Sequence, residues 1–218
     1  MAISVPRLLK VLRAGYRGRV WAWTGRDEFE VIAGAILTQR TSWNNVRIAL
    51  ENLRSSGNLS QESILSLGEA RVRKYIRPAG FYKQKSEYLV NIVEYMRDRY
   101  QSDISRMRRT PTGQLREELL ALRGIGPETA DAILLYALGK PSFVVDAYTY
   151  RLMWRLGRSI GKDYDTAKSV FEKAMKGNAR DYADMHSLIV IHSKERCRKV
   201  PICDSCPLYR PCVSKGRY

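Results

Sequence analysis

Apolar residues recur at intervals of three and four along most of this chain, with polar residues between them. That spacing is typical of amphipathic helices. No run of β-branched residues in strict alternation is long enough to build a sheet. We therefore predict an all-α fold. The expected helices span residues 1–12, 29–54 with a break at 41–45, 63–75, 81–100, 114–122, 127–138, a segment ending near 156, 165–175 and 181–193.

A short corner with two glycines, Gly124-Ile-Gly126, joins two of these helices. Glycine lets the backbone turn tightly with positive φ, and Pro127 suits the first position of the helix that follows. We predict a helix–hairpin–helix unit whose second helix presents free N–H groups in its first turn. Such groups bind a phosphate through hydrogen bonds and the helix dipole. The alternative is a tight corner that binds nothing.

The charge of the chain points to an anionic partner. Lysine and arginine number 38 and acidic residues 22, which gives a formal net charge of +16. This charge favours binding to nucleic acid over a basic but inert surface. No segment approaches the roughly 18 apolar residues that cross a bilayer, and residues 1–12 lack the features of a signal peptide. We expect an intracellular protein, cytoplasmic or associated with the nucleoid, without membrane contact.

Two stretches carry side chains that suit contact with a base. Trp21 and Trp23 either cap the core or offer faces on which a base stacks, a cationic base best of all. Gln39 lies at the break in the pattern of residues 29–54, where a polar side chain projects from the helix. The alternative at this break is a helix-capping cluster around Thr41 and Ser42.

Aromatic and basic residues also stand together at the start of the helix over 81–100. Phe81 and Tyr82 precede Lys85, a combination that suits a loop inserted into a groove or, alternatively, a hydrophobic staple. A basic connector follows this helix at residues 102–112.

Asp146 is a candidate for acid–base or electrostatic chemistry, because it ends the apolar run Phe143-Val-Val. The structural alternative is that Asp146 caps the N-terminus of the next helix.

Four cysteines, with spacing Cys197-x5-Cys203-x2-Cys206-x5-Cys212, close the chain. Four thiolates within sixteen residues suit zinc or an iron–sulfur cluster, and the spacing alone leaves both open. Because the protein would supply all four ligands, no coordination position stays open, and we expect a noncatalytic role.

Taken together, these motifs resemble the helix–hairpin–helix DNA glycosylases of the endonuclease III superfamily, over residues 20–215. Residues 122–130 resemble the hairpin, so the resemblance makes Gly124, Gly126 and Thr129 DNA-binding residues. Asp146 resembles the catalytic aspartate of the family. Gln39 resembles the glutamine that fills the space of a flipped base, and residues 80–85 resemble a wedging loop, which adds three DNA contacts: Phe81, Tyr82 and Lys85.

The resemblance implies two helical domains that flank a DNA-binding cleft. The first is a six-helix barrel-type domain over residues 20–138, which ends in the helix–hairpin–helix at 113–138. The second, residues 1–19 plus 139–218, carries Asp146 and an iron–sulfur loop at 194–213. Residues 188–192, which lead into the cysteines, resemble the approach to the 4Fe–4S loop, so the expected cofactor is a 4Fe–4S cluster on Cys197, Cys203, Cys206 and Cys212, with zinc as the alternative.

Two features depart from the family pattern. Bifunctional members carry a lysine where this chain has Glu128, and glutamate does not form the Schiff base that strand cleavage requires. We therefore expect little or no lyase activity. The first cysteine spacing is five residues, where the family usually has six.

Within the superfamily, residues 29–46 and 128–136 are most similar to the 3-methyladenine glycosylases, in which tryptophans line the base pocket. Trp23 stands at the matching distance, and Trp21 is a second candidate. The expected function is hydrolytic release of alkylated purines from double-stranded DNA by a monomer. The alternatives are a glycosylase for uracil, mismatched thymine or oxidised bases, and a noncatalytic module that binds damaged DNA.

Overall fold

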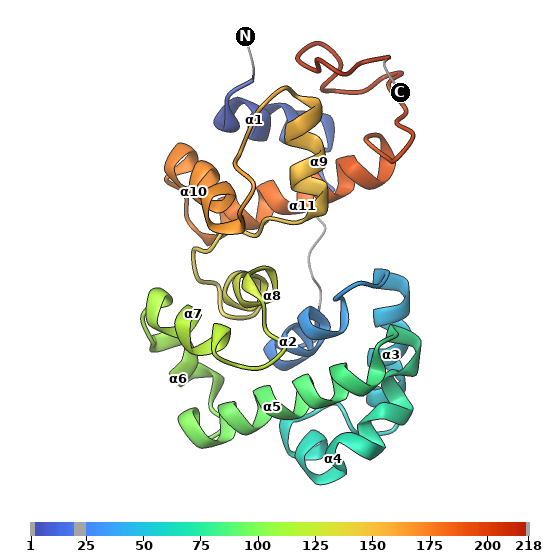
Figure 1. Cartoon of the computed structure of the whole chain (residues 1–218), viewed down its shortest axis with the longest axis vertical. Coiled ribbons are helices and arrows are strands. Elements are labelled where there is room, and N and C mark those ends of the chain that lie inside the picture. The colour runs from blue at the N-terminus through green and yellow to red at the C-terminus, as the bar shows by residue number, and fades with distance from the viewer. Residues whose placement is uncertain (1–2, 20–24, 217–218) are drawn as a thin grey trace. The chain divides into compact units, whose positions relative to one another are not determined.

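The computed structural model describes residues 3–19 and 25–216, and within these residues every regular element is helical (Figure 1). This confirms the predicted all-α class. The chain divides into two units, each with its own core. We call residues 23–140 the continuous unit, and residues 1–22 with 141–218 the split unit.

The continuous unit is built around one buried helix. Helix α2 (Glu28–Leu37) is apolar on nearly all sides, and every residue from Phe29 to Leu37 is buried, as expected for a helix enclosed by others. It packs against α3, α5 and η2. The other helices are α3 (Trp43–Ser55), α4 (Gln61–Ile76), the 3₁₀ turn η1 (Arg77–Ala79), α5 (Tyr82–Tyr100), α6 (Ile104–Arg109), α7 (Thr112–Leu120) and α8 (Pro127–Ala132), which continues as the π-helical turn η2 (Ile133–Ala137).

The break predicted near residues 41–45 is real and has a local cause. Helix α2 ends at Leu37, and Arg40 adopts a left-handed backbone with φ of 52°. Helix α3 then begins after Ser42, whose hydroxyl accepts a hydrogen bond from the Asn45 N–H at 3.3 Å. The capping serine starts a new helix in a new direction, and Gln39 lies in the turn between the two.

The connector at residues 102–112 contains a helix that the sequence pattern did not predict. The Asp103 carboxylate caps α6 by accepting a hydrogen bond from the Ser105 N–H at 2.8 Å, and Met107 is fully buried. A single buried residue in six is too weak a pattern to mark a helix from sequence.

The split unit joins the first helix of the chain to the last three. They are α1 (Val5–Gly15), α9 (Ala147–Arg155), α10 (Tyr164–Met175) and α11 (Ala179–Glu195). Helix α11 packs against both α1 and α9 (Figure 1). The core includes stacked rings of Phe143 and Phe171, whose centroids lie 4.3 Å apart. No helix in the described part of the chain is long and apolar enough to cross a membrane.

Candidate functional site

Glycine suits each of the two corner positions for a different structural reason. Gly124 has φ of 89°, and a Cβ there would lie 2.2 Å from the ring of Tyr88. Gly126 has φ of −89°, and a Cβ there would meet nothing within 4 Å. The prediction of positive φ therefore holds for Gly124 and is wrong for Gly126. Gly126 leaves the first turn of α8 without a side-chain cap and open to an approaching group.

A buried ion pair holds the two helices of the corner together. Arg116 on α7 donates two hydrogen bonds to Asp131 on α8, from Nε to Oδ1 at 2.9 Å and from Nη2 to Oδ2 at 3.3 Å. The Asp131 side chain has no exposed surface. A two-pronged contact of this kind fixes orientation as well as distance, so it sets how α7 and α8 are oriented at the corner.

Gln39 lies against this corner. Its Nε2 donates to the carbonyl oxygen of Gly124 at 2.8 Å and to Thr129 Oγ1 at 3.1 Å. Thr129 itself is buried. The structure thus brings together three predicted DNA-binding residues, with Thr129 as a partner of Gln39 rather than a surface group.

The turn before α5 presents an aromatic side chain to solvent. Phe81 is 54% exposed and has φ of 46°, a left-handed conformation that bulky residues rarely adopt. The neighbouring Tyr82 is partly buried, with the Arg77 guanidinium 5.6 Å from its ring centroid. An exposed apolar residue in a strained conformation is a feature that clusters at functional sites.

Lys85 lies inside the continuous unit, which corrects the prediction that its side chain contacts DNA. Only 1% of it is exposed. Its Nζ donates to the carbonyl oxygens of Leu37 and Ala79, each at 2.8 Å. Burial lowers the pKa of this ammonium to about 8. Lys85 therefore connects two backbone carbonyl groups inside the unit and does not present its charge at the surface.

In the split unit, Asp146 caps helix α9. Its Oδ1 accepts hydrogen bonds from the Thr149 N–H at 2.7 Å and from Thr149 Oγ1 at 2.8 Å, and Thr149 Oγ1 in turn accepts from the Asp146 N–H. The second oxygen, Oδ2, lies 3.5 Å from Nε2 of His186 on α11. The side chain of Asp146 is 13% exposed, so the carboxylate is held firmly without being sealed off.

The surroundings of Asp146 keep it ionised. Burial alone would raise its pKa, but the His186 ring and the two Thr149 donors outweigh burial and hold the pKa of Asp146 below its usual range. Lys194 lies on the same helix as His186. Burial lowers the pKa of the Lys194 ammonium, and the negative charge of Asp146 partly opposes that lowering. Sequence reasoning missed His186. One of only two histidines in the chain, it lies forty residues away, and its only signal is a polar ring in an apolar helix.

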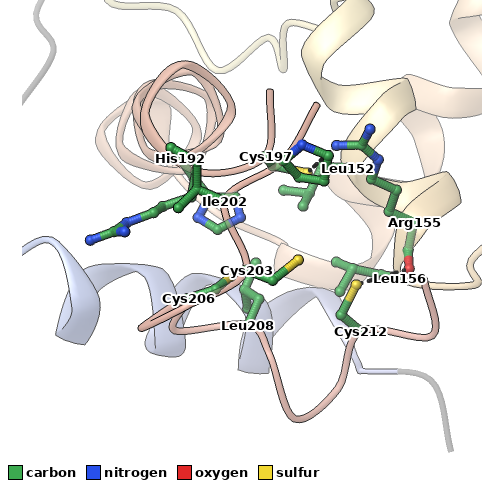
Figure 2. A pocket seen from close by; sticks show the side chains of 12 residues that line it. Leu152, Arg155, Leu156, His192, Cys197, Ile202, Cys203, Cys206, Leu208 and Cys212 are labelled. Carbon is green, nitrogen blue, oxygen red and sulfur yellow. Dashed lines mark hydrogen bonds between the residues drawn. The ribbon is translucent and has the colours of Figure 1, made fainter. Parts of the chain in front are cut away.

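The four cysteines of the C-terminal loop line one pocket that is partly open to solvent (Figure 2). Its other walls are mostly apolar, with Leu152, Leu156 and Leu208 among them, and Figure 2 shows these side chains around the cysteines. Among the described residues, no group of three Cys, His, Asp or Glu side chains is arranged to hold a single metal ion.

Two arginines of α9 tie this loop to that helix. Arg155 donates to the Cys197 sulfur at 3.2 Å and to the carbonyl oxygens of Arg198 and Lys199 at 2.7 and 3.0 Å. Arg151 donates from Nε to the Cys197 carbonyl oxygen at 3.0 Å. The loop thus presents four sulfur donors around one pocket, a donor set of the kind that zinc and iron–sulfur clusters take.

Residues 33–179 match the family model of the HhH-GPD superfamily base excision DNA repair proteins. The chain belongs to this family. Among its relatives is MJ1434 of Methanocaldococcus jannaschii, a candidate DNA repair glycosylase that is 43% identical over 214 residues, 97% of this chain and 96% of that protein. Endonuclease III of Haemophilus influenzae is 28% identical over 191 residues, 87% of this chain and 85% of that enzyme.

Solved structures agree with the HhH-GPD assignment. The 3-methyladenine DNA glycosylase MagIII of H. pylori, solved with 1,N6-ethenoadenine, has a TM-score of 0.79 and is 30% identical, covering 88% of this chain and 98% of that one. A noncovalent endonuclease III–DNA complex has a TM-score of 0.81 at 20% identity, covering 96% of this chain and 94% of that one, which is a likeness of fold. The chain is therefore a DNA repair glycosylase by family. The two residues expected to line the base pocket, Trp21 and Trp23, lie outside the described residues.

Proposed function

We propose that this HhH-GPD protein is a monofunctional DNA glycosylase, which hydrolyses the bond between a damaged base and its sugar and leaves the strand uncut. One observation carries the proposal. Asp146 is a partly enclosed carboxylate at a helix N-terminus, held ionised by Thr149 and His186.

The continuous unit would bind and distort the DNA. The open first turn of α8 at Gly126 offers backbone N–H groups for a phosphate, favoured by the helix dipole. Gln39 would fill the space left by a base that has rotated out of the stack, and the exposed ring of Phe81 would wedge the opposite strand. Unstacking a base takes a few kcal/mol, which these contacts must offset.

Asp146 would act on the everted nucleotide. As the bond from C1′ to the base nitrogen breaks, positive charge develops on the sugar, and an ionised carboxylate stabilises it. Asp146 would also orient a water molecule and accept its proton as the water oxygen bonds to C1′. The base leaves with the electrons of the broken C1′–N bond, and a lone pair of the water oxygen forms the new bond to C1′.

Glu128 supports the monofunctional part of the proposal. It occupies the first turn of α8, where the bifunctional members of the family carry a lysine. A carboxylate has no amine with which to form a Schiff base to the abasic sugar. Its charge is instead favoured by the N-terminus of the helix.

We propose an alkylated purine such as 3-methyladenine as the substrate. The support is the 30% identity with MagIII over 88% of the chain, together with the motifs at 29–46 and 128–136. Such a base is cationic, which weakens its bond to the sugar and favours stacking on an aromatic face.

We further propose that Cys197, Cys203, Cys206 and Cys212 hold a 4Fe–4S cluster, with zinc as the alternative. The support is that all four cysteines line one pocket, together with the resemblance of residues 188–192 to the approach to a 4Fe–4S loop. When bound, the cluster would cross-link the basic loop and take no part in hydrolysis. A brown preparation that absorbs visible light and bleaches on cluster loss is expected, and a colourless protein that contains zinc would contradict the cluster.

A panel of duplexes tests the function. Each carries one lesion: an alkylated purine, uracil, thymine opposite guanine, or an oxidised base. Free base is measured directly, and strand breaks are counted before and after alkali. We expect base release from the alkylated duplex, with breaks only after alkali. Release from another lesion would reassign the substrate, and tight binding without release from any would indicate a noncatalytic damage-binding module.

A further inference from the structure

One buried ammonium, that of Lys85, bonds to two turns of the continuous unit. Each turn carries a side chain that we propose inserts into DNA. Lys85 donates to the carbonyl oxygen of Leu37, two residues before Gln39, and to that of Ala79, two residues before Phe81. Both contacts are 2.8 Å long. From this geometry we infer that Lys85 is a positioning residue that couples the Gln39 turn to the Phe81 turn, so that both insert into DNA as one unit. The inference rests on the proposed function.

Both turns have backbones that need to be held. Arg40, next to Gln39, has φ of 52°, and Phe81 has φ of 46°. The left-handed region is unfavourable for residues with a Cβ, so such conformations persist only where surrounding contacts impose them. The Lys85 N–H adds a third restraint by donating to the Phe81 carbonyl oxygen at 3.0 Å.

The coupling extends to the phosphate-binding corner. Gln39 donates to Gly124 and Thr129 while its turn is anchored through Leu37 to Lys85. Hydrogen bonds thus connect the turn that carries Gln39 to the Gly124 corner and, through Lys85, to the turn that carries Phe81. Movement of the Gln39 turn relative to the Phe81 turn would break at least one of the two Lys85 hydrogen bonds.

A lysine suits this place because a single ammonium donates up to three hydrogen bonds from the end of a flexible stem. Methionine has a similar stem but no donor, so Lys85→Met would keep most of the packing and leave two buried carbonyl oxygens without this partner. The substitution therefore removes the link while it changes the volume little.

A double-mutant cycle tests the inference. The variants are Lys85→Met, Phe81→Ala and the double variant. The first readout is fluorescence of 2-aminopurine beside an abasic-site analogue, which reports insertion without requiring chemistry. The second is the single-turnover rate of base release. We expect Lys85→Met to reduce insertion and release about tenfold in the wild-type background and less than about twofold in the Phe81→Ala background.

Lys140→Met is the matched control. Lys140 is also buried in the continuous unit, and its Nζ donates to the carbonyl oxygen of Thr110, which belongs to neither turn. We expect this variant to lose stability but to keep insertion and release, and to combine additively with Phe81→Ala. If Lys85→Met does not fold, Lys85→Gln replaces it in the same cycle.

Additive effects of Lys85→Met and Phe81→Ala, or an unchanged insertion signal in Lys85→Met, would overturn the inference. The two proposals fail separately. A coupled insertion signal with no base released from any lesion would contradict the proposed function alone.

Discussion

At the residue scale, one aspartate is both an observed helix cap and the proposed catalytic carboxylate. Asp146 caps α9 and is also the carboxylate offered for catalysis. Its cap was predictable, because capping depends on residues two or three positions away. Its partner His186 was not, since only the folding of α11 against α9 brings the ring to 3.5 Å.

Removing the His186 ring should shift the pH dependence of base release. The pKa of Asp146 is lowered in the folded protein, so its ionised form is present above that pKa and is lost as pH falls through it. In His186→Leu, burial remains while a stabilising neighbour is gone, and the pKa rises. The acid limb of the single-turnover rate should therefore move to higher pH. The control His186→Gln keeps a polar neighbour, and identical profiles for wild type and the leucine variant would contradict this account.

Lys85 should make stability depend on pH in alkaline solution. Burial lowers its pKa to about 8, whereas the unfolded chain has a value of about 10.4. Between these values the unfolded state binds a proton that the folded state does not, so the free energy of unfolding rises with pH. Urea unfolding at pH 7.5 and 9.5 should show wild type gaining stability relative to Lys85→Met. If wild type and Lys85→Met differed in free energy of unfolding by the same amount at both pH values, the lowered pKa of Lys85 would be contradicted.

At the scale of elements, most helices were predictable because they carry a clear apolar stripe, and the exception is α6, which buries only Met107. The short corner was predictable from Gly124-Ile-Gly126, but not the separate reasons for its glycines. Lys85 shows the limit most clearly. Its position at the start of a helix suggested an exposed cation, while the adjoining turns enclose it.

The two glycines of the corner should respond differently to alanine. In Gly124→Ala, φ of 89° and the Tyr88 ring oppose a Cβ, and we expect a loss of stability of roughly 2 kcal/mol. Gly126→Ala has free space, so its stability should change by less than about 0.5 kcal/mol. Its affinity for duplex DNA should nevertheless fall, because the methyl group stands where a phosphate would approach. Thermal unfolding and fluorescence anisotropy distinguish the two, and unaltered DNA affinity in Gly126→Ala would remove this corner from the DNA contact.

At the scale of the whole molecule, charge and family lead to the same partner. A formal charge of +16 favours a polyanion, and the HhH-GPD family repairs DNA. Composition does not show which side chains act together. That depends on contacts between residues far apart in the chain, such as Gln39 with Gly124.

Binding to DNA should be strongly salt-dependent. If the protein neutralises about six phosphates, its affinity should fall roughly 10³-fold between 50 and 200 mM salt. Anisotropy titrations of an undamaged duplex across this range measure the slope. A flat dependence would mean that the basic surface does not contact the phosphate backbone.

The most direct test of the central claim compares wild type with Asp146→Asn on a duplex that carries one alkylated purine. The asparagine is close in size but cannot supply a negative charge, so base release should slow by about 10²-fold or more. Binding to an abasic-site duplex should stay within about threefold, because the substitution leaves the proposed phosphate-binding and inserting residues unchanged. Wild type should release the free base and leave a strand that breaks only in alkali. Equal release by both proteins, or strand breaks before alkali, would contradict the account.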